Sequence, residues 1–161
     1  SVTEERQKQV SFTDKYYSTP LSVAVPKDSP ITALDAEAFK GKSIGAQGST
    51  TQATYAEDVY GKAGADVKLY PTADEANADL KSGRLDAVIS DKFPISDWIK
   101  GDGGACCKLI GDVPGTQTDT AIAVRKDDND LREQFNAAIK KIREDGTYAT
   151  VVKKYFDFDI Y

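Results

Sequence analysis

The chain has 161 residues, of which 40% are hydrophobic and 29% charged, and its formal net charge is −5. This profile is typical of a soluble globular protein with one domain or two small lobes. The scattered basic residues argue against nucleic-acid binding. The absence of histidine removes the commonest general base and zinc ligand, which excludes a His-based triad and argues against a metal site. We expect no cofactor.

No membrane span or export signal is visible in the sequence. No apolar run approaches the roughly 20 residues that a membrane helix needs. The first ten residues, SVTEERQKQV, are polar and charged, so they do not predict a signal peptide. If the protein is exported, its signal was removed or lies outside this sequence.

The first half of the chain predicts strands that alternate with short helices. Residues 21–26 (LSVAVP) are apolar and β-branched, which is typical of a buried strand. A turn is expected at residues 28–30 and a short helix over residues 32–39. A second strand is predicted over residues 43–47 (SIGAQ). Residues 48–64 begin with small polar side chains and continue at helical spacing, which predicts a tight loop followed by a helix.

The second half continues this alternation and ends in two helices. Thr72 with Glu75, and Asp130 with Glu133, have the spacing of a capping box. The alternation predicts an α/β fold with mainly parallel strands, whose ligands sit at the carboxyl ends of strands. The predicted strands are 65–71, 85–91, 108–113 and 118–128, and the predicted helices are 72–82, 93–104, 131–145 and 147–156, followed by an apolar tail at 158–161. The apolar stripe of the long helix is Leu131, Phe135, Ala138, Ile139 and Ile142.

The only two cysteines, Cys106 and Cys107, are neighbours in the sequence. Neighbouring residues meet the geometry of a disulfide only if the peptide between them is distorted. We therefore expect two small thiol side chains in a loop, rather than a vicinal disulfide or a bridge to another chain. The pair has neither the spacing of a zinc site nor that of a CxxC motif.

Three polar features could hold a zwitterion, although each also has a simpler structural explanation. Residues 48–52 (GSTTQ) open a helix and suit a carboxylate, but Ser49 or Thr50 could be an ordinary N-cap. Asp91 ends a buried strand and could pair with an ammonium group, or act as a cap or turn residue. Arg6 could hold a carboxylate through two hydrogen bonds, or lie on the surface. Together they supply what an amino acid requires.

Four segments, in the right order, resemble the polar amino-acid-binding proteins of bacterial ABC transporters, and the resemblance covers almost the whole chain. SVTEERQKQVSFTDKYY resembles the family pattern S-x-T-x-x-R-x-x-x-[IV]-x-F-[ST]-x-x-Y. LDAEAFKGKSIGAQGSTTQATY is similar to L-x-G-K-x-[IV]-G-[VA]-x-x-G-[ST]-T, and ADLKSGRLDAVISD to L-x-x-G-R-[IVL]-D-A-x-x-x-D. The segment DNDLREQFNAAIKKIREDGTYATVVKKYFDFDIY resembles the C-terminal helix pair and tail. The subgroup resembled binds lysine, arginine and ornithine, histidine, or octopine and nopaline.

The resemblance implies a type II periplasmic-binding-protein-like two-lobe fold, with lobe 2 complete and lobe 1 partial. Residues 1–18 would be a remnant of lobe 1, residues 19–117 lobe 2, and residues 118–161 the hinge return and the C-terminal part of lobe 1. The hinge strands would cross near residues 18–22 and 115–121. Ligand would close the lobes in the periplasm, and a membrane permease would recognise the closed form.

The family's ligand-binding positions can be carried over to this sequence. The resemblance implies that Arg6 holds the α-carboxylate of the ligand and that Ser1 offers a hydroxyl or backbone contact. It implies that Thr51 donates a hydroxyl or N–H to the carboxylate, that Asp91 accepts from the α-ammonium, and that Gln47 lies toward the ligand side chain. The full implied set is Ser1, Arg6, Gln47, Thr51, Gln52 and Asp91.

Two departures from the family pattern affect these expectations. The family usually has glycine where this chain has Ser49, with Gly48 before it. The chain also begins inside the family's ligand loop, so about the first third of a typical mature protein precedes it. We therefore expect lobe 2 to fold alone and residues 119–161 to lack their native sheet partners. Helix 131–142 would then expose its apolar stripe, or bury it against another chain or a separate N-terminal fragment.

The resemblance implies a binding protein without catalysis, which delivers a polar or cationic amino acid, or an opine, to its permease. A first alternative is an enzyme on the same fold, similar to cyclohexadienyl dehydratase, which would need a general acid in its cleft. A second alternative is the ligand-sensing domain of a receptor, which would need fused membrane or signalling segments.

Overall fold

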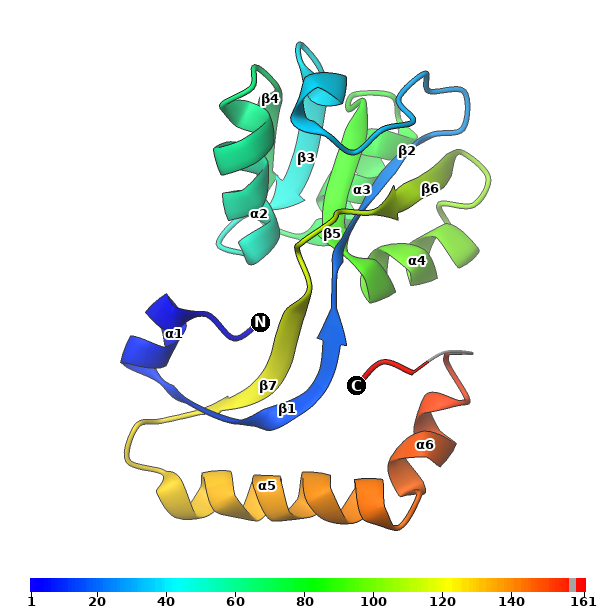
Figure 1. Ribbon diagram of the computed structural model, residues 1–161. Coiled ribbons are helices and arrows are strands. Elements are labelled where there is room, and N and C mark those ends of the chain that lie inside the picture. Colours follow the sequence, from blue (N-terminus) through cyan, green and yellow to red (C-terminus); the bar gives the residue numbers. More distant parts are fainter. Residues whose placement is uncertain (157–158) are drawn as a thin grey trace. The chain divides into compact units, whose positions relative to one another are not determined.

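The computed structural model describes residues 1–156 and 159–161, which form two compact units (Figure 1). Unit 1 consists of Ser1–Thr19 and Gln117–Tyr161, and unit 2 of Pro20–Thr116. The chain therefore passes between the units twice. No helix among the described residues is long and apolar enough to cross a membrane.

Unit 2 is built on a five-stranded sheet with the strand order β4-β3-β5-β2-β6. Strand β3 is parallel to β4 and β5, whereas β2 is antiparallel to β5 and β6. The expectation of mainly parallel strands is wrong, because residues 27–42 contain only the 3-10 turn η1 (Ala36–Phe39) and no crossover helix that would bring the chain back parallel to β2. The strands are β2 (Leu21–Pro26), β3 (Ser43–Gln47), β4 (Asp66–Tyr70), β5 (Ala87–Asp91) and β6 (Cys107–Asp112).

Helices cover both faces of this sheet, and alternating side chains divide the core into two clusters. Val23 and Ile89 point toward one face and pack with residues of η1, α2 and η2. Ala24 and Val88 point toward the other face and pack with residues of α3 and α4. Both faces of β2 are buried, which is why its sequence is continuously apolar. The helices are α2 (Thr51–Tyr55), the π-helical turn η2 (Ala56–Gly61), α3 (Ala73–Lys81) and α4 (Lys92–Lys100).

Helix α3 has the predicted capping box and packs closely on the sheet. The Thr72 hydroxyl accepts a hydrogen bond from the Glu75 N–H, and the Glu75 carboxylate accepts one from the Thr72 N–H. Gly45 of β3 allows the approach, because a Cβ atom there would lie 2.5 Å from Leu85 Cδ1 and 3.5 Å from Ala76 Cβ. Any larger residue at position 45 would therefore displace its neighbours.

Unit 1 contains the antiparallel pair β1 (Ser11–Thr19) and β7 (Thr118–Val124), with helix α5 (Asn129–Glu144) packed on it. Among the described residues this sheet has two strands. The apolar stripe of α5 is packed at its centre, where Ile139 is 7% exposed, while Leu131 at its start is 43% exposed. The stripe is thus only partly exposed, contrary to our expectation. Helices α1 (Glu4–Gln9) and α6 (Thr147–Val152) complete the unit.

The start of α5 differs from the predicted capping box at Asp130 and Glu133. The N-cap residue is Asp128, and its side chain makes no capping hydrogen bond. Its carboxylate instead accepts a hydrogen bond from Arg125 Nε at 2.7 Å. The N-cap therefore lies two residues earlier than the pattern indicates, and the loop that precedes the helix holds its acidic side chain.

The C-terminal tail is anchored on β1. Helix α6 ends at Val152, earlier than the predicted helix end at residue 156. The first residue of the predicted apolar tail, Phe158, lies outside the described residues. Further along, the carbonyl of Ile160 accepts a hydrogen bond from the Ser18 N–H at 2.7 Å. The Tyr161 ring lies against the guanidinium of Arg143, with 3.0 Å from Cζ to the ring centroid.

The two cysteines form a disulfide, so the expectation of two free thiols is wrong. Consecutive residues of a strand point to opposite faces, which would separate their sulfur atoms. Cys106, however, is the last residue of the turn after α4, and only Cys107 belongs to β6. The alternation of a strand therefore does not apply to the pair, and both side chains join the cluster beneath α3 and α4.

Candidate functional site

The carboxyl ends of β3 and β5 meet at one edge of the sheet in unit 2. The two strands are direct parallel neighbours, with Ile44 opposite Ala87 and Gly45 opposite Val88. The turn that begins α2 follows β3, and Asp91 ends β5. Helix α2 also contacts β5. The sheet topology thus places two of the features identified in the sequence side by side, where ligands of α/β sheets commonly bind.

The turn between β3 and α2 has a defined and unusual backbone. Thr50 is the N-cap of α2, because its hydroxyl accepts from the Ala53 N–H at 3.1 Å and donates to the Gln47 carbonyl at 2.6 Å. Ser49 has φ of +60°, the left-handed region that favours glycine. The position where the family usually has glycine therefore keeps a glycine-like conformation here, although serine occupies it.

Thr51 and Gln52 form the first turn of α2. Both residues are half-buried. The Thr51 hydroxyl donates a hydrogen bond to Gln52 Oε1 at 3.3 Å. The first turn of a helix has N–H groups that the helix itself does not bond, and these suit an anion such as a carboxylate. Gln47 is exposed at the end of β3, opposite Tyr70 of β4. It therefore lies at the same end of β3 as the turn that begins α2.

Asp91 occupies the N-cap position of α4, but its side chain makes no capping hydrogen bond. The residue is half-buried, and its Oδ1 atom is shielded from solvent. The next residue, Lys92, extends its ammonium group to Asp112, with 2.6 Å between Nζ and Oδ2. Asp112 also accepts from the Ser22 hydroxyl at 2.5 Å. The Asp91 side chain thus does not act as a helix cap, which was its simpler structural explanation.

In unit 1, Arg6 and Ser1 lie together at the N-terminal segment. Thr3 caps α1 by accepting from the Arg6 N–H at 3.2 Å. The Arg6 guanidinium reaches back and donates to the Ser1 carbonyl through Nη1 at 3.0 Å. The Val2 N–H donates to the Asp119 carbonyl at 2.9 Å, which fixes the segment on β7. Ser1 and Arg6 line a cavity of about 360 Å³ in unit 1.

A polar network on β1 and β7 was not anticipated from the sequence. The Ser18 hydroxyl donates to Asp119 Oδ1 at 2.5 Å, and Lys15 Nζ donates to the same oxygen at 3.3 Å. The Ser18 hydrogen bond, followed by that of Lys15, lowers the pKa of the Asp119 carboxyl below its usual value. Ser18 and Asp119 are 101 positions apart, so no local pattern could have paired them.

The predicted site residues therefore fall into two groups. Unit 2 brings Thr51, Gln52 and Asp91 to one sheet edge, with Gln47 nearby. Unit 1 holds Ser1 and Arg6 in direct contact. Each group is internally ordered by hydrogen bonds or by sheet pairing.

Comparison with known proteins identifies a family and a set of relatives. The sequence profile of the bacterial extracellular solute-binding proteins, family 3, matches residues 1–158. The chain is 37% identical to the histidine-binding periplasmic protein of Escherichia coli strain K12 over 168 residues. It is also 37% identical to the L-arginine-binding protein of Pseudomonas aeruginosa over 166 residues. In both cases 100% of this chain aligns with 64% of the relative, so the chain spans about 64% of the length of these proteins.

Solved structures show the same fold. An ancestral arginine-binding protein bound to arginine matches with a TM-score of 0.85 and 34% sequence identity, over 97% of this chain and 68% of that structure. An arginine-, lysine- and histidine-binding protein from Geobacillus stearothermophilus matches with a TM-score of 0.86 and 29% identity, over 98% of this chain and 67% of that structure. The α/β architecture described above is therefore about two thirds of a two-lobe amino-acid-binding fold.

Proposed function

Because this chain belongs to the bacterial extracellular solute-binding proteins of family 3, we propose that it is the amino-acid-binding part of an ABC importer. Unit 2 corresponds in this proposal to lobe 2, and unit 1 to a part of lobe 1. The observation that carries the proposal is the sheet edge of unit 2, where the β3–α2 turn and Asp91 converge. An N–H-rich helix start beside a carboxylate is complementary to the carboxylate and the ammonium of an amino acid.

In this proposal, different residues bind the α-carboxylate and the α-ammonium of the ligand. Thr51 and Gln52 donate to the α-carboxylate, and Asp91 accepts from the α-ammonium. Arg6 of unit 1 adds a guanidinium, which matches a carboxylate through two parallel hydrogen bonds. A hydrogen bond from Nη1 to the Ser1 carbonyl holds the guanidinium at the N-terminal segment of unit 1. Ser1 and Gln47 are further contacts in the proposal.

The ligand that we propose is a polar or cationic amino acid. Relatives that align with this whole chain bind histidine, arginine, or lysine, arginine and ornithine, according to their names. An opine is the second candidate, because opines keep the α-carboxylate and a positively charged α-nitrogen, although that nitrogen carries a further substituent. The described residues would grip either ligand by these two groups.

We propose further that the protein binds its ligand without converting it. The named relatives are binding proteins, and the alternative enzyme would need a general acid in addition to the groups that hold the substrate. In this proposal Asp91 accepts from the α-ammonium, so it is not assigned as that acid. Relatives are named as periplasmic proteins, which supports a periplasmic location and a permease of the inner membrane as the partner.

Titration calorimetry tests this proposal, using the full natural polypeptide that contains residues 1–161. Arginine, lysine, ornithine, histidine, octopine and nopaline form the panel, with an aliphatic dicarboxylate as the control. We expect saturable binding of at least one member and none of the dicarboxylate. Turnover of prephenate without binding of any amino acid would instead favour the dehydratase-like alternative.

A further inference from the structure

The vicinal disulfide lies where the turn after α4 joins the edge strand β6. Cys106 is half-buried, whereas Cys107 is 2% exposed. The sheet edge proposed to hold the amino acid does not include either residue. The pair is therefore a chemically reactive feature of unit 2 that the proposed function does not use.

The cross-link contributes little to the stability of unit 2. A disulfide stabilises mainly by restricting the unfolded chain, and the effect grows with the length of the loop that it closes. No residue lies between Cys106 and Cys107, so almost no chain entropy is removed. The backbone is also held without it, because Lys27 N–H donates to the Cys106 carbonyl at 2.9 Å and Cys107 N–H to the Gly103 carbonyl at 2.9 Å.

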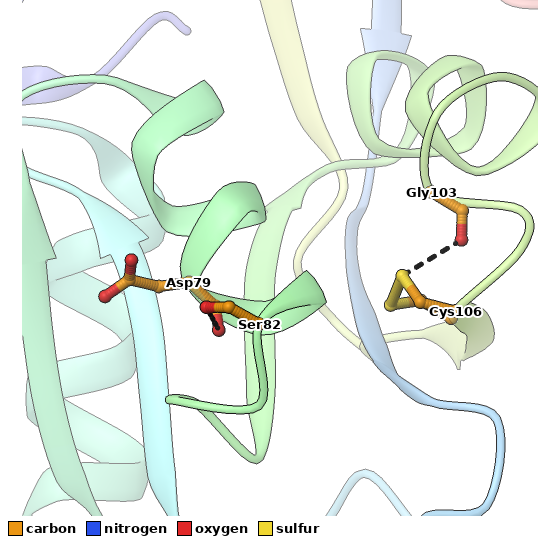
Figure 2. The surroundings of a disulfide bond; sticks show 5 residues. Asp79, Ser82, Gly103 and Cys106 are labelled. Atoms are coloured by element: carbon orange, nitrogen blue, oxygen red, sulfur yellow. Dashed lines mark hydrogen bonds between the residues drawn. A yellow bond between two sulfur atoms is a disulfide. The ribbon is translucent and has the colours of Figure 1, made fainter.

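The local structure also accommodates the reduced pair. The Cys106 sulfur lies 3.3 Å from the Gly103 carbonyl oxygen, and Figure 2 shows this oxygen directed at the sulfur. A sulfur in a disulfide has no proton to donate, so only the thiol form can make this hydrogen bond. Cys107 packs in a cluster with Leu80 and Ile95, where a neutral thiol behaves as a small apolar side chain.

We propose that Cys106–Cys107 is a reversible thiol–disulfide site, which a dithiol reduces without unfolding unit 2. A thiolate of the dithiol attacks the more accessible Cys106 sulfur, the S–S bond breaks, and Cys107 leaves as a thiolate that takes up a proton. The second thiol of the dithiol then attacks its own sulfur in the mixed disulfide and releases Cys106. Two electrons and two protons reach the protein, and the dithiol becomes a disulfide.

The chain carries its own reporter of this reaction. Trp98 is the only tryptophan. It belongs to the apolar cluster around the cysteines, and a Cβ atom on Gly103 would lie 2.6 Å from its ring. Disulfides quench indole fluorescence by accepting an electron from the excited ring. Opening the disulfide should therefore increase the emission of Trp98.

Reduction of the native chain by dithiothreitol, without denaturant, tests the proposal. We expect iodoacetamide to label both cysteines after reduction, the far-ultraviolet circular dichroism to stay unchanged, and the emission of Trp98 to rise. Oxidised glutathione should restore the starting spectrum and mass. Two free thiols in the air-oxidised protein, reduction only in denaturant, or loss of secondary structure on reduction would each overturn the proposal.

The order of attack is tested separately. The variant C107S keeps the accessible thiol and should react with iodoacetamide about 10-fold faster than C106S, which keeps the buried one. A monothiol reductant under native conditions provides a check that needs no variant, because peptide mass mapping should find the mixed disulfide on Cys106. Equal labelling rates of C107S and C106S, or a mixed disulfide on Cys107, would contradict the assigned order.

Discussion

Asp91 is the residue whose chemistry and position agree most directly with an ammonium-binding role. It ends a buried parallel strand beside the turn of Thr51. Its identity as a strand-end carboxylate is visible in the sequence, whereas the preference for an ammonium-binding role over a cap or turn came from the family resemblance. The pairing of Ser18 with Asp119 and the left-handed backbone of Ser49 were not predictable, because both depend on tertiary contacts or on a loop conformation.

Replacing Asp91 with asparagine should weaken amino-acid binding by about 30-fold or more, because the ligand ammonium would lose its counter-charge, an effect of roughly 2 kcal/mol or above. The matched control is Asp97→Asn, which removes an exposed carboxylate on the same helix α4. Calorimetry should show nearly unchanged affinity for the control. Equal affinity in both variants would remove Asp91 from the site.

Replacing Ser49 with glycine should destabilise the protein less than replacing it with a β-branched residue. The left-handed conformation costs a β-branched side chain about 1–2 kcal/mol, so Ser49→Val should lower the free energy of unfolding by that amount. Ser49→Gly should change it by less than about 1 kcal/mol, because relief of strain offsets the greater freedom of the unfolded chain. Urea unfolding of both variants measures the difference. A valine variant as stable as the glycine variant would contradict the assigned backbone.

Asp119 should make the stability of unit 1 dependent on acid pH. Its pKa is lowered in the folded state, so its stabilising contribution is present above the usual carboxyl range near about 3.9 and is lost as the pH falls through the folded pKa. The stability difference between the wild type and Asp119→Asn should therefore shrink from pH 7 to pH 3. Urea unfolding at both pH values measures it, with exposed Asp127→Asn as the control. A difference that grows toward acid pH would have the wrong sign.

At the scale of elements, the sequence predicted what depends on local contacts. The strand 21–26 and the capping box of Thr72 and Glu75 follow from side chains that are close in sequence. The antiparallel direction of β2 was not predicted, because it depends on the path of residues 27–42. The start of α5 was not predicted either, because it depends on the hydrogen bond between Arg125 and Asp128. The disulfide was missed because the distortion that it imposes on the peptide between neighbouring cysteines was taken to exclude it.

Helix α5 should be anchored at its centre rather than at its start. Ile139→Ala would leave a cavity at a buried position of α5 and should lower the free energy of unfolding by about 2–4 kcal/mol. Leu131→Ala, the matched truncation at a 43% exposed position, should cost less than about 1 kcal/mol. Urea unfolding followed by circular dichroism compares them. Equal losses would mean that the start of the helix is also covered.

At the scale of the whole molecule, the family resemblance predicted more of the architecture than the order of strands and helices did. Alternating strands and helices indicated an α/β fold, but only the ordered motifs indicated two lobes. The structure adds that unit 2 has helices on both faces of a five-stranded sheet, whereas the sheet of unit 1 has two strands among the described residues. The two units therefore differ in how much of their stability comes from their own core.

Unit 2 should fold as an isolated polypeptide. Residues 20–116 contain both apolar clusters and all five strands of the sheet, so their burial does not depend on unit 1. We expect a single cooperative unfolding transition in urea, with native-like circular dichroism below it. A polypeptide of these residues that unfolds without cooperativity would show that unit 2 needs the rest of the chain.

The most direct test of the central claim, that the protein grips an amino acid by its backbone groups, is calorimetry with altered ligands. The best-binding amino acid is compared with its decarboxylated analogue and with its analogue that lacks the α-amino group, both on the full natural polypeptide. We predict that each analogue binds at least about 30-fold more weakly, because each leaves Arg6 and Thr51, or Asp91, without a charged partner. An analogue that binds as tightly as the amino acid itself would contradict the account.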